Sequence, residues 1–482
     1  MTGKALICRL EKQKEIFGAD RIAQVTMFGE TVIVSKDYKE GMIGLLFDCE
    51  TQLSHEYASA NNLYRNKELN KDKTKKGYLG NNRRIKPIVL KEVQCSAMFM
   101  PIESLSFIST DTGKYPRVGQ EIESFDGIPI CSKYIPLDLS EIKSLSKKGQ
   151  GTLRLKAKTF KNHFKTDQWG RNYHKLKEGD FVIITEKIHG TAGVCGYLPV
   201  KTKLNWWQKF CFFLTDLKWG RTLSHYEFIA GSKRLITFIN NNFNGVDERY
   251  NQSVYANVAK KYFKGKLRKG ESVYYEITGF YPNGLPIMGS HSNEKLKKFM
   301  SKSEYKEFID RYGKTTEFTY GCSNYVQPQT KNYIVDETKE SFPQPTIISY
   351  PNFEKTINNR VFIYRITMTN DDGKSIDLSW QQVKTRSKQL GVAHVPELYV
   401  GFPYNPKANP IEKNENALKH LVENFTESDS KNFPQHINEG VCVRIENGSL
   451  TPQIYKSKRF LFKVLENIIK DNPDNIDVEE TN

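Results

Sequence analysis

A lysine at the end of an apolar strand is the feature that most restricts what this chain can be. Residues 181–184 are all apolar and predict a buried strand. The triplet His189-Gly190-Thr191 predicts a tight turn, and residues 192–198 predict a return strand. Lys187 stands where the first strand ends. Because a buried or half-buried lysine needs a charged partner or a function, the rest of the chain has to explain it.

The charge of the chain predicts a polyanionic partner. The 482 residues include 72 Lys+Arg against 55 Asp+Glu, a net charge of +17. Nucleic acid is the first expectation and an anionic membrane surface the second, while a basic, solvated surface stays open as the alternative. The most hydrophobic patch, residues 205–220, contains Lys209 and Asp216 and is too short to span a bilayer, so no membrane is expected.

The cysteines and the N-terminus predict a cytoplasmic protein. None of the 8 cysteines belongs to a C-x-x-C motif, which argues against a zinc site or a thioredoxin-like centre. Charged residues interrupt the first fifteen positions, where a signal peptide would need an apolar core. We therefore expect a soluble protein in a reducing compartment.

The patterning divides the chain into four regions. Residues 1–135 hold short strand-like runs and predict a small β-barrel of the OB type that binds nucleic acid. A sandwich, and a structural β-domain without a ligand, stay open. Residues 136–178 form a basic linker or bridge. From Lys143 to Lys177 it has 11 basic residues and one acidic residue, with aromatic residues between them. This composition suits binding to nucleic acid, with basic groups at the phosphates and aromatic rings at the bases. It equally suits a solvated linker.

The two remaining regions complete the predicted architecture. Residues 179–465 alternate strand-like runs with helical stretches at about 204–217, 252–267, 293–313, 380–391 and 415–425. This predicts an α+β domain of antiparallel sheets with flanking helices. Residues 466–482 are acidic and polar, and we expect a disordered tail.

The chemistry open to Lys187 depends on the motifs that the chain lacks and on those downstream of it. No P-loop motif occurs. An amine that loses its proton can attack the α-phosphate of a nucleoside triphosphate, which gives a lysyl-N-phosphoramidate and releases pyrophosphate. Such chemistry needs cations for the phosphate, a carboxylate for a divalent metal and a polar group for the ribose. Taken alone, each candidate is more often a solvated strand-end residue; the candidates are Lys233, Arg234, Glu276, Glu439, Lys456 and Lys458.

The order of these short motifs carries a resemblance. K-x-H-G, S-K-R, Y-E-I-x-G, an aromatic strand, E-G-V-x-V-R and K-x-K follow one another along the chain. In this order the chain resembles the ATP-dependent, nick-sealing RNA ligases with an N-terminal OB domain, within the covalent nucleotidyltransferases. The resemblance implies Lys187 as the catalytic nucleophile and Glu439 as the metal-associated carboxylate. It implies the following contacts with ATP or AMP: Glu186, Ile188, Arg234, Glu276 at the ribose, Phe362 or Tyr364 at the adenine, and Lys456 and Lys458 at the phosphates. It implies the following contacts with nucleic acid: His163, Lys165, Thr166, His189 and Lys233.

Compared with a minimal ligase of this family, the stretches at about 200–222 and 290–345 look like inserts. The implied activity is sealing of 3′-OH/5′-phosphate ends in RNA repair, with ATP and Mg²⁺ or Mn²⁺. The partner would be RNA or an RNA-containing duplex, and an end-healing kinase or phosphatase could act together with the chain. The chain is expected to act as a monomer. DNA ligases and GTP-using capping enzymes share these motifs but carry an OB domain after K-x-K. Here the chain ends at residue 482, 24 residues beyond Lys458, which favours the RNA ligase. A capping-type guanylyltransferase and a non-catalytic nucleic-acid-binding relative remain the alternatives.

Overall fold

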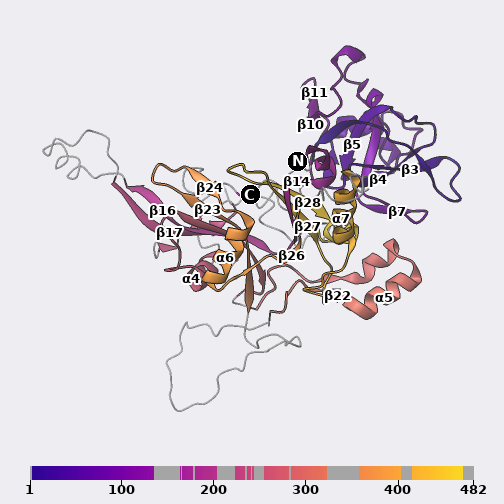
Figure 1. Cartoon of the computed structure of the whole chain (residues 1–482). Helices are drawn as coiled ribbons and strands as arrows, with labels where there is room; N and C mark the ends of the chain where they lie inside the picture. Colours follow the sequence, from indigo (N-terminus) through magenta and orange to yellow (C-terminus); the bar gives the residue numbers. More distant parts are fainter. Residues whose placement is uncertain are drawn as a thin grey trace, which may run out of the picture.

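The computed structural model describes residues 3–134, 163, 166–176, 180–202, 223–233, 236–239, 242–243, 254–281, 284–322, 358–402 and 415–470. Their elements form a β-rich N-terminal region and a larger α+β region, which lie side by side (Figure 1).

The N-terminal region is built from short, mostly antiparallel strands. One sheet has the order β10-β1-β5-β9, another has the order β2-β3-β4, and the remaining strands form two-stranded ladders. The elements of this region are β1 (Ala5–Arg9), β2 (Lys14–Glu15), β3 (Ile22–Met27), β4 (Glu30–Ser35), β5 (Ile43–Asp48), β6 (Thr51–Leu53), α1 (His55–Ala60), β7 (Ile88–Leu90), β8 (Val93–Cys95), β9 (Ala97–Pro101), β10 (Glu121–Ile122), β11 (Ser124–Phe125), β12 (Ile128–Pro129) and β13 (Cys131–Lys133).

Two apolar clusters cover the two faces of the β1–β5–β9 sheet. Ile7 and Leu45 point to one side and pack with Tyr57 of α1, whereas Leu6 and Leu46 point to the other side and pack against β3 and β4. This alternation follows the two-residue period of a strand. Among the described residues the hydrogen-bonded strands do not close into one barrel, so the OB-type barrel remains a prediction.

The first sheet of the larger region carries the predicted nucleophile strand. Its order is β14-β28-β27-β15-β26, which places β15 between β27 and β26. Val182 and Ile184 pack with Val441 and Val443 under α7, on the face opposite to the second sheet's core. The elements are β14 (Asp167–Gln168), β15 (Phe181–Glu186), β26 (Glu397–Gly401), α7 (Glu415–Glu427), β27 (Gly440–Glu446) and β28 (Gln453–Lys458).

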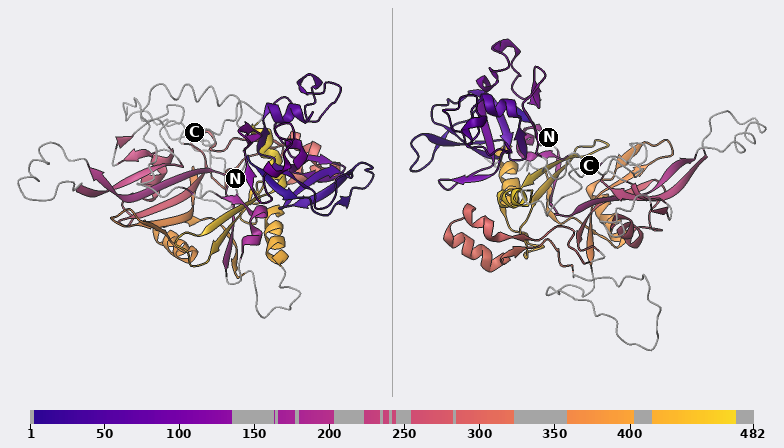
Figure 2. Two further views of the ribbon diagram at one scale, coloured as in Figure 1. Left: turned by 90° about the horizontal axis from the view of Figure 1, so that it is seen from above. Right: turned by 180° about the vertical axis from the view of Figure 1, so that it is seen from behind.

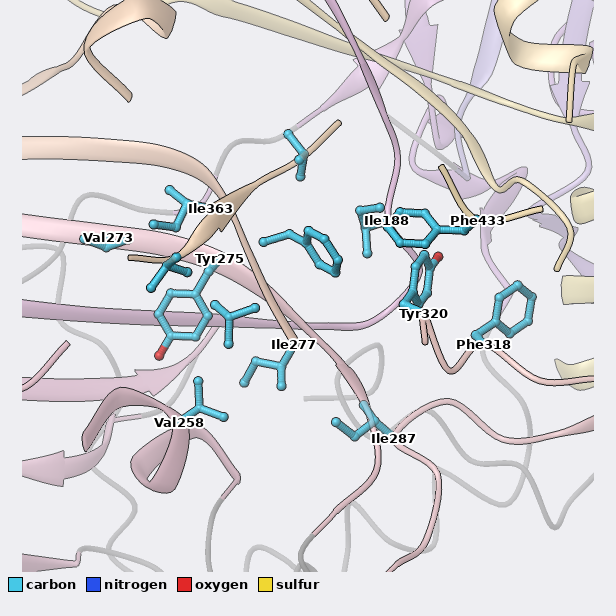
Figure 3. Close-up of a cluster of buried hydrophobic side chains, with 14 of the residues drawn as sticks. Ile188, Val258, Val273, Tyr275, Ile277, Ile287, Phe318, Tyr320, Ile363 and Phe433 are labelled. Atoms are coloured by element: carbon cyan, nitrogen blue, oxygen red, sulfur yellow. The ribbon is translucent and has the colours of Figure 1, made fainter. Parts of the chain in front are cut away.

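The second sheet is longer and faces the main core. Its order is β19-β18-β17-β16-β20-β23-β24, with β25 pairing alongside β23. Tyr275 and Ile363 from neighbouring strands pack with Val258 of α4 in this core (Figure 3). The elements are β16 (Thr191–Thr202), β17 (Leu223–Ser232), β18 (Ile236–Ile239), β19 (Asn242–Phe243), α4 (Val254–Tyr262), β20 (Glu271–Gly279), β23 (Asn359–Thr369), β24 (Ser375–Asp377) and β25 (Ala393–His394).

Local sequence explains the helix ends. α5 (Lys302–Tyr312) begins with a capping box of Ser301 and Glu304, and α6 (Trp380–Leu390) begins with one of Ser379 and Gln382. Gly391 ends α6 in the left-handed conformation that glycine adopts without strain. A short strand pair, β21 (His291–Ser292) and β22 (Thr315–Thr316), flanks α5.

Helix α8 (Phe460–Lys470) is not among the helices that the sequence predicts. It crosses the boundary predicted at residue 465, and residues 471–482 of the predicted tail lie outside the described residues.

The described end of the predicted bridge is part of the fold rather than a free linker. β14 pairs in parallel with β28, at Gln168↔Lys456, and so extends the first sheet by a strand. Trp169 is buried against Tyr455, and Arg171 reaches Asp48 and Glu121 of the N-terminal region. The segment thereby joins the two regions, which stay adjacent in both views of Figure 2.

Within the described residues, no helix is both long and apolar enough to cross a membrane. The cysteines that the structure describes are free thiols.

Candidate active site

Backbone hydrogen bonds hold the start of the loop (residues 187–190) that carries the predicted nucleophile, Lys187. Lys187 comes directly after the last residue of β15, and its amide donates to the carbonyl oxygen of Gly440 at 2.9 Å. The preceding residue, Glu186, donates its amide to Pro396 at 2.8 Å and accepts from Asn432 Nδ2 at 3.1 Å. These contacts fix Lys187 at the edge of the sheet with its side chain half-buried.

Lys187 and Glu439 form an ion pair at the centre of the site. Lys187 Nζ lies 2.8 Å from Glu439 Oε1, and Glu439 is only 3 % exposed. His189 Nδ1 lies 3.4 Å from Glu439 Oε2, and Lys458 Nζ lies 3.8 Å from Oε1. Burial alone would raise the pKa of Glu439, but Lys187, His189 and Lys458 outweigh it, so the pKa lies well below its ordinary value. Glu439 is therefore a carboxylate that stays ionised.

The same ion pair shifts the pKa of Lys187 upward, opposite to its effect on the pKa of Glu439. Burial favours the neutral amine of Lys187, but the nearby carboxylate of Glu439 outweighs burial and raises the pKa above its ordinary value. The charge of Glu276 adds to this rise, so Glu276 also lies within electrostatic reach of Lys187.

Lys456 and Lys458 extend the site along β28. Cross-strand pairing aligns Lys456 with Cys442 and Cys442 with Thr185, so these three side chains share a face of the sheet. Burial lowers the pKa of Lys456, and the charges of Lys458 and Lys187 lower it further, against the opposing charge of Glu50. Lys456 and Lys458 thus belong to the same charged cluster as Lys187.

Lys458 is enclosed by carboxylates. Its Nζ contacts Glu466 at 2.8 Å and Glu50 at 3.4 Å, and its side chain is 9 % exposed. Burial alone would lower the pKa of Lys458, but Glu466 and Glu50 outweigh it and hold the pKa well above its ordinary value.

The second sheet presents the predicted ribose and adenine residues together. Ala192, Glu276 and Phe362 are cross-strand neighbours on β16, β20 and β23, and so share one face. Gly190 of the K-x-H-G turn packs close to Glu276, where a Cβ would meet the Ile277 carbonyl oxygen and the Glu276 side chain. The turn therefore needs glycine to approach the Glu276 strand.

Both aromatic candidates lie on this face, at different points. Phe362 packs against Tyr320 and Phe433. A register shift in the pairing of β20 with β23 leaves Tyr364 beside Tyr274, which shares the face of Glu276. The hydroxyl of Tyr364 lies 2.8 Å from His163 Nδ1, and burial, with Lys233 and Arg365, lowers the pKa of His163 to about 3. His163 is therefore neutral near pH 7.

An aromatic cluster lies under the loop that carries Lys187 (Figure 3). Ile188 points into it beside Phe433 and Tyr320. The hydroxyl of Tyr320 accepts a hydrogen bond from the amide of His189 at 2.7 Å. Tyr320 belongs to the stretch predicted as an insert from about residue 290, so part of that stretch supports the loop directly.

The remaining predicted contacts with nucleic acid, Lys233, Thr166 and Lys165, lie outside the charged cluster around Lys187 or outside the described residues. Lys233 is exposed at the end of β17, and Thr166 is partly buried beside β14. Lys165 lies outside the described residues, as does Arg234, which the resemblance predicts as a contact with ATP or AMP.

Sequence reasoning missed several residues of this site, namely Glu50, Tyr320, Asn432, Gly440 and Glu466. Gly440 had a signal, because it comes directly after Glu439 within the E-G-V-x-V-R motif. The others contact the site from distant segments, and no local pattern marks them.

Glu439 is the one carboxylate beside Lys187 that the structure offers as a ligand for a divalent metal among the described residues. The described residues contain no group of three or more His, Cys, Asp or Glu side chains that would hold a metal ion by themselves. Glu439 Oε2 is buried and makes no hydrogen bond of good geometry. Since Mg²⁺ often takes only one or two protein carboxylates and completes its shell with water and substrate phosphates, Glu439 fits such an ion.

The overall architecture has counterparts among solved structures. No protein-family model matches the chain, and no curated protein matches it by sequence. A point variant of the Naegleria gruberi RNA ligase without ligand is similar, with a TM-score of 0.51 and 12% identity over 97% of this chain and 100% of that chain. Another variant of that ligase, solved with ATP and Mn, has a TM-score of 0.50 at 12% identity, over 95% of this chain and 98% of that chain. A third variant, solved without ligand, also has a TM-score of 0.50 and 12% identity, over 95% of this chain and 97% of that chain. The chain therefore has the fold of an RNA ligase.

Proposed function

We propose that the chain is an ATP-dependent RNA ligase that joins 3′-OH and 5′-phosphate ends in RNA or an RNA-containing duplex, in RNA repair. The observation that carries the proposal is the contact between Lys187 and Glu439, flanked by Lys458, in a chain with this fold. A nucleophile, a metal-competent carboxylate and phosphate-neutralising cations come from three separate motifs and meet at one point. The ATP and Mn bound to the Naegleria gruberi enzyme support the choice of nucleotide and of a divalent metal.

The proposed reaction has three steps. The neutral amine of Lys187 attacks the α-phosphorus of ATP, an N–P bond forms, and pyrophosphate leaves. The AMP group passes from Lys187 to a 5′-phosphate, which restores the amine and forms a 5′,5′-pyrophosphate. The 3′-OH then attacks the 5′-phosphate, the new phosphodiester forms, and AMP leaves.

Each residue has a defined task in this proposal. Glu276 orients the ribose, and Phe362 or Tyr364 stacks on the adenine. Lys456 and Lys458 offset phosphate charge, while Glu186 and Ile188 anchor the loop that carries Lys187 on its buried side. Glu439 would hold Mg²⁺ or Mn²⁺, an ion that supplies charge neutralisation at the phosphates. His189 lies 3.4 Å from the second oxygen of Glu439, and this electrostatic contact helps to orient the carboxylate.

Substrate binding is assigned to the N-terminal region and the basic bridge. Lysine and arginine contacts to the backbone give binding with little sequence preference. Preference for RNA would require contact with a 2′-OH. We further propose that the protein works as a cytoplasmic monomer, alongside an enzyme that heals the ends when they are damaged.

The test is incubation with α-labelled ATP or α-labelled GTP in the presence of Mg²⁺ or Mn²⁺, followed by a denaturing gel. Label from ATP supports the ligase. Label from GTP alone would favour a capping-type guanylyltransferase, and no label from either would favour a protein that binds nucleic acid without chemistry.

A further inference from the structure

Acidic residues of the N-terminal region dock onto basic residues of the first sheet and its helices. Glu30 contacts Lys463 of α8 at 2.7 Å, and Asp48 contacts Arg171 at 3.4 Å. Glu50 contacts Lys458 at 3.4 Å. The side chains of these pairs are at most 15 % exposed, so the interface removes charged groups from water and depends on their pairing.

The Glu50 contact differs from the others because its partner belongs to the candidate active site. Lys458 also lies 3.8 Å from Glu439, which lies 2.8 Å from Lys187. A continuous line of alternating charges therefore runs from the N-terminal region to the nucleophile, through Glu50, Lys458, Glu439 and Lys187. The charge of Glu50 also acts on Lys456, where it opposes the effect of burial on the pKa.

The backbone holds Glu50 firmly in place. It lies in the tight turn that joins β5 to β6, and its amide donates to Asp48 Oδ1 at 3.3 Å. Its carbonyl oxygen accepts from the amide of Tyr134 at 3.0 Å. Thr51 Oγ1 also donates to Asp48 Oδ1, at 2.9 Å, and Arg171 holds the other oxygen of that carboxylate. The carboxylate of Glu50 is thus presented to Lys458 from a rigid turn.

From this arrangement we infer that Glu50 is a positioning residue for Lys458, so that the N-terminal region completes the phosphate-binding part of the active site. The sequence predicts nucleic-acid binding alone for that region, and the inference rests on the proposed function. Lys458 has competing carboxylates in Glu439 and Glu466. Without the charge of Glu50, the ammonium group moves toward those two, away from the place where it would meet a phosphate and closer to the partner of Lys187.

The experiment compares Glu50→Gln with Glu30→Gln in the full-length chain. Both substitutions remove one charge from an ion pair between the two regions, but Glu30 pairs with Lys463 of α8 rather than with a lysine of the candidate active site. Melting temperatures of both variants report the loss of docking. Single-turnover labelling with α-labelled ATP, over a range of ATP concentrations, reports the maximal adenylylation rate separately from the apparent affinity.

We expect Glu50→Gln to lower the maximal adenylylation rate about tenfold, since a displaced charged group of this kind costs a factor of about 10 to 100. Glu30→Gln should stay within about twofold of the wild-type rate, while its melting temperature falls by about as much as that of Glu50→Gln. In a Lys458→Ala background, Glu50→Gln should change the rate by no more than about twofold. A positioning residue acts mainly through the group that it positions, and only the charge of Glu50 on Lys456 remains in that background.

Two results would overturn the inference. One is an equal loss of rate in the Glu50 and Glu30 variants, which would mean that both pairs only dock the regions. The other is a full, additive effect of Glu50→Gln in the Lys458→Ala background. Failure of the proposed function looks different, because the wild-type chain itself would then take up no label.

Discussion

Lys187 Nζ lies 2.8 Å from Glu439 Oε1, so the candidate nucleophile and the candidate metal ligand are one ion pair. The pair places the amine, but it also raises the pKa of Lys187 and so keeps the group protonated. An amine attacks phosphorus only as the neutral base. Any interaction that draws Glu439 away from Lys187 lowers that pKa, which links the state of the carboxylate to the reactivity of the lysine.

Replacing Glu439 with Gln should therefore have two separable effects. The maximal rate of lysine adenylylation should fall more than about tenfold, since an electrostatic group of this type contributes a few kcal/mol. The rise of the rate with pH should move to lower pH, because the raised pKa of Lys187 loses the carboxylate that opposes burial. The measurement is the single-turnover labelling rate between about pH 6 and pH 10. Glu307→Gln, exposed on the surface of α5, is the control. A Glu439 variant with the wild-type rate and pH profile would refute the assignment.

Gly440 should tolerate no side chain. Its φ is +135°, and a Cβ would overlap the carbonyl oxygen of Ser457 on β28. Its own carbonyl oxygen also accepts the amide of Lys187. Gly440→Ala should lower the free energy of unfolding by about 3 kcal/mol and slow adenylylation, because both strain and displacement of β28 contribute.

Gly448→Ala is the matched control for that substitution. Gly448 also has a positive φ, of +80°, but no described atom lies within 4 Å of the position that its Cβ would take. The variant should lose only about 1 kcal/mol of unfolding free energy, from backbone strain, and keep the wild-type adenylylation rate. Equal losses of stability in the two variants would show that close packing of β28 against Gly440 does not exclude a side chain there.

His436 should make stability depend on pH. It is buried and stacked on Phe433, and burial lowers its pKa from 6.5 to about 4. The unfolded chain therefore binds a proton between these two values and the folded chain does not. Because protonation favours the unfolded chain, His436 leaves the free energy of unfolding at its full value above pH 6.5. That free energy then decreases as the pH falls toward 4.

The difference between wild type and His436→Phe isolates this effect. The phenyl ring keeps the stacking and cannot titrate. On going from about pH 7 to about pH 5, wild type should lose about 2 kcal/mol more free energy of unfolding than the variant, from about 1.4 kcal/mol per unit of pKa shift. Urea unfolding at the two pH values measures it, and parallel losses would mean that His436 is not buried in its neutral form.

The local parts of the fold were open to prediction from the sequence. β15, β20, β27 and β28 occur where short runs of apolar and β-branched residues predict strands, and α4, α6 and α7 occur where the helical period predicts helices. Lys187, Glu276, Glu439 and Lys456 could be found because each belongs to a short motif at the end or within one of these strands. Helix α8 was not predicted, because residues 460–465 are apolar except for Lys463, and so short a run does not distinguish a helix from a strand.

The long-range parts of the site were not open to prediction. Glu50 meets Lys458 from 408 positions away, and Tyr320 meets His189 from 131 positions away. Such pairs depend on how separate elements pack, and no local pattern encodes that packing. The roles of Phe362 and Tyr364 depend on the register shift in the β20–β23 ladder, which breaks the simple alternation of strand faces.

Sealing of a strand that already carries a 5′-adenylate separates the steps of the reaction. Lys187→Ala should still seal such a strand, more slowly than wild type, because this step needs no amine nucleophile. The same variant should not seal a strand with an ordinary 5′-phosphate and ATP. The two substrates are compared on one preparation by denaturing gel, and sealing of the 5′-phosphate strand would contradict the proposed sequence of steps.

The most direct test of the proposed chemistry is the position of the label after reaction with α-labelled ATP. The wild-type chain is digested, and the modified peptide is identified by mass spectrometry. The proposed mechanism predicts AMP on Lys187 and no labelled protein in the Lys187→Ala variant. Full label uptake by that variant, or AMP on a different lysine of the wild-type chain, would contradict it.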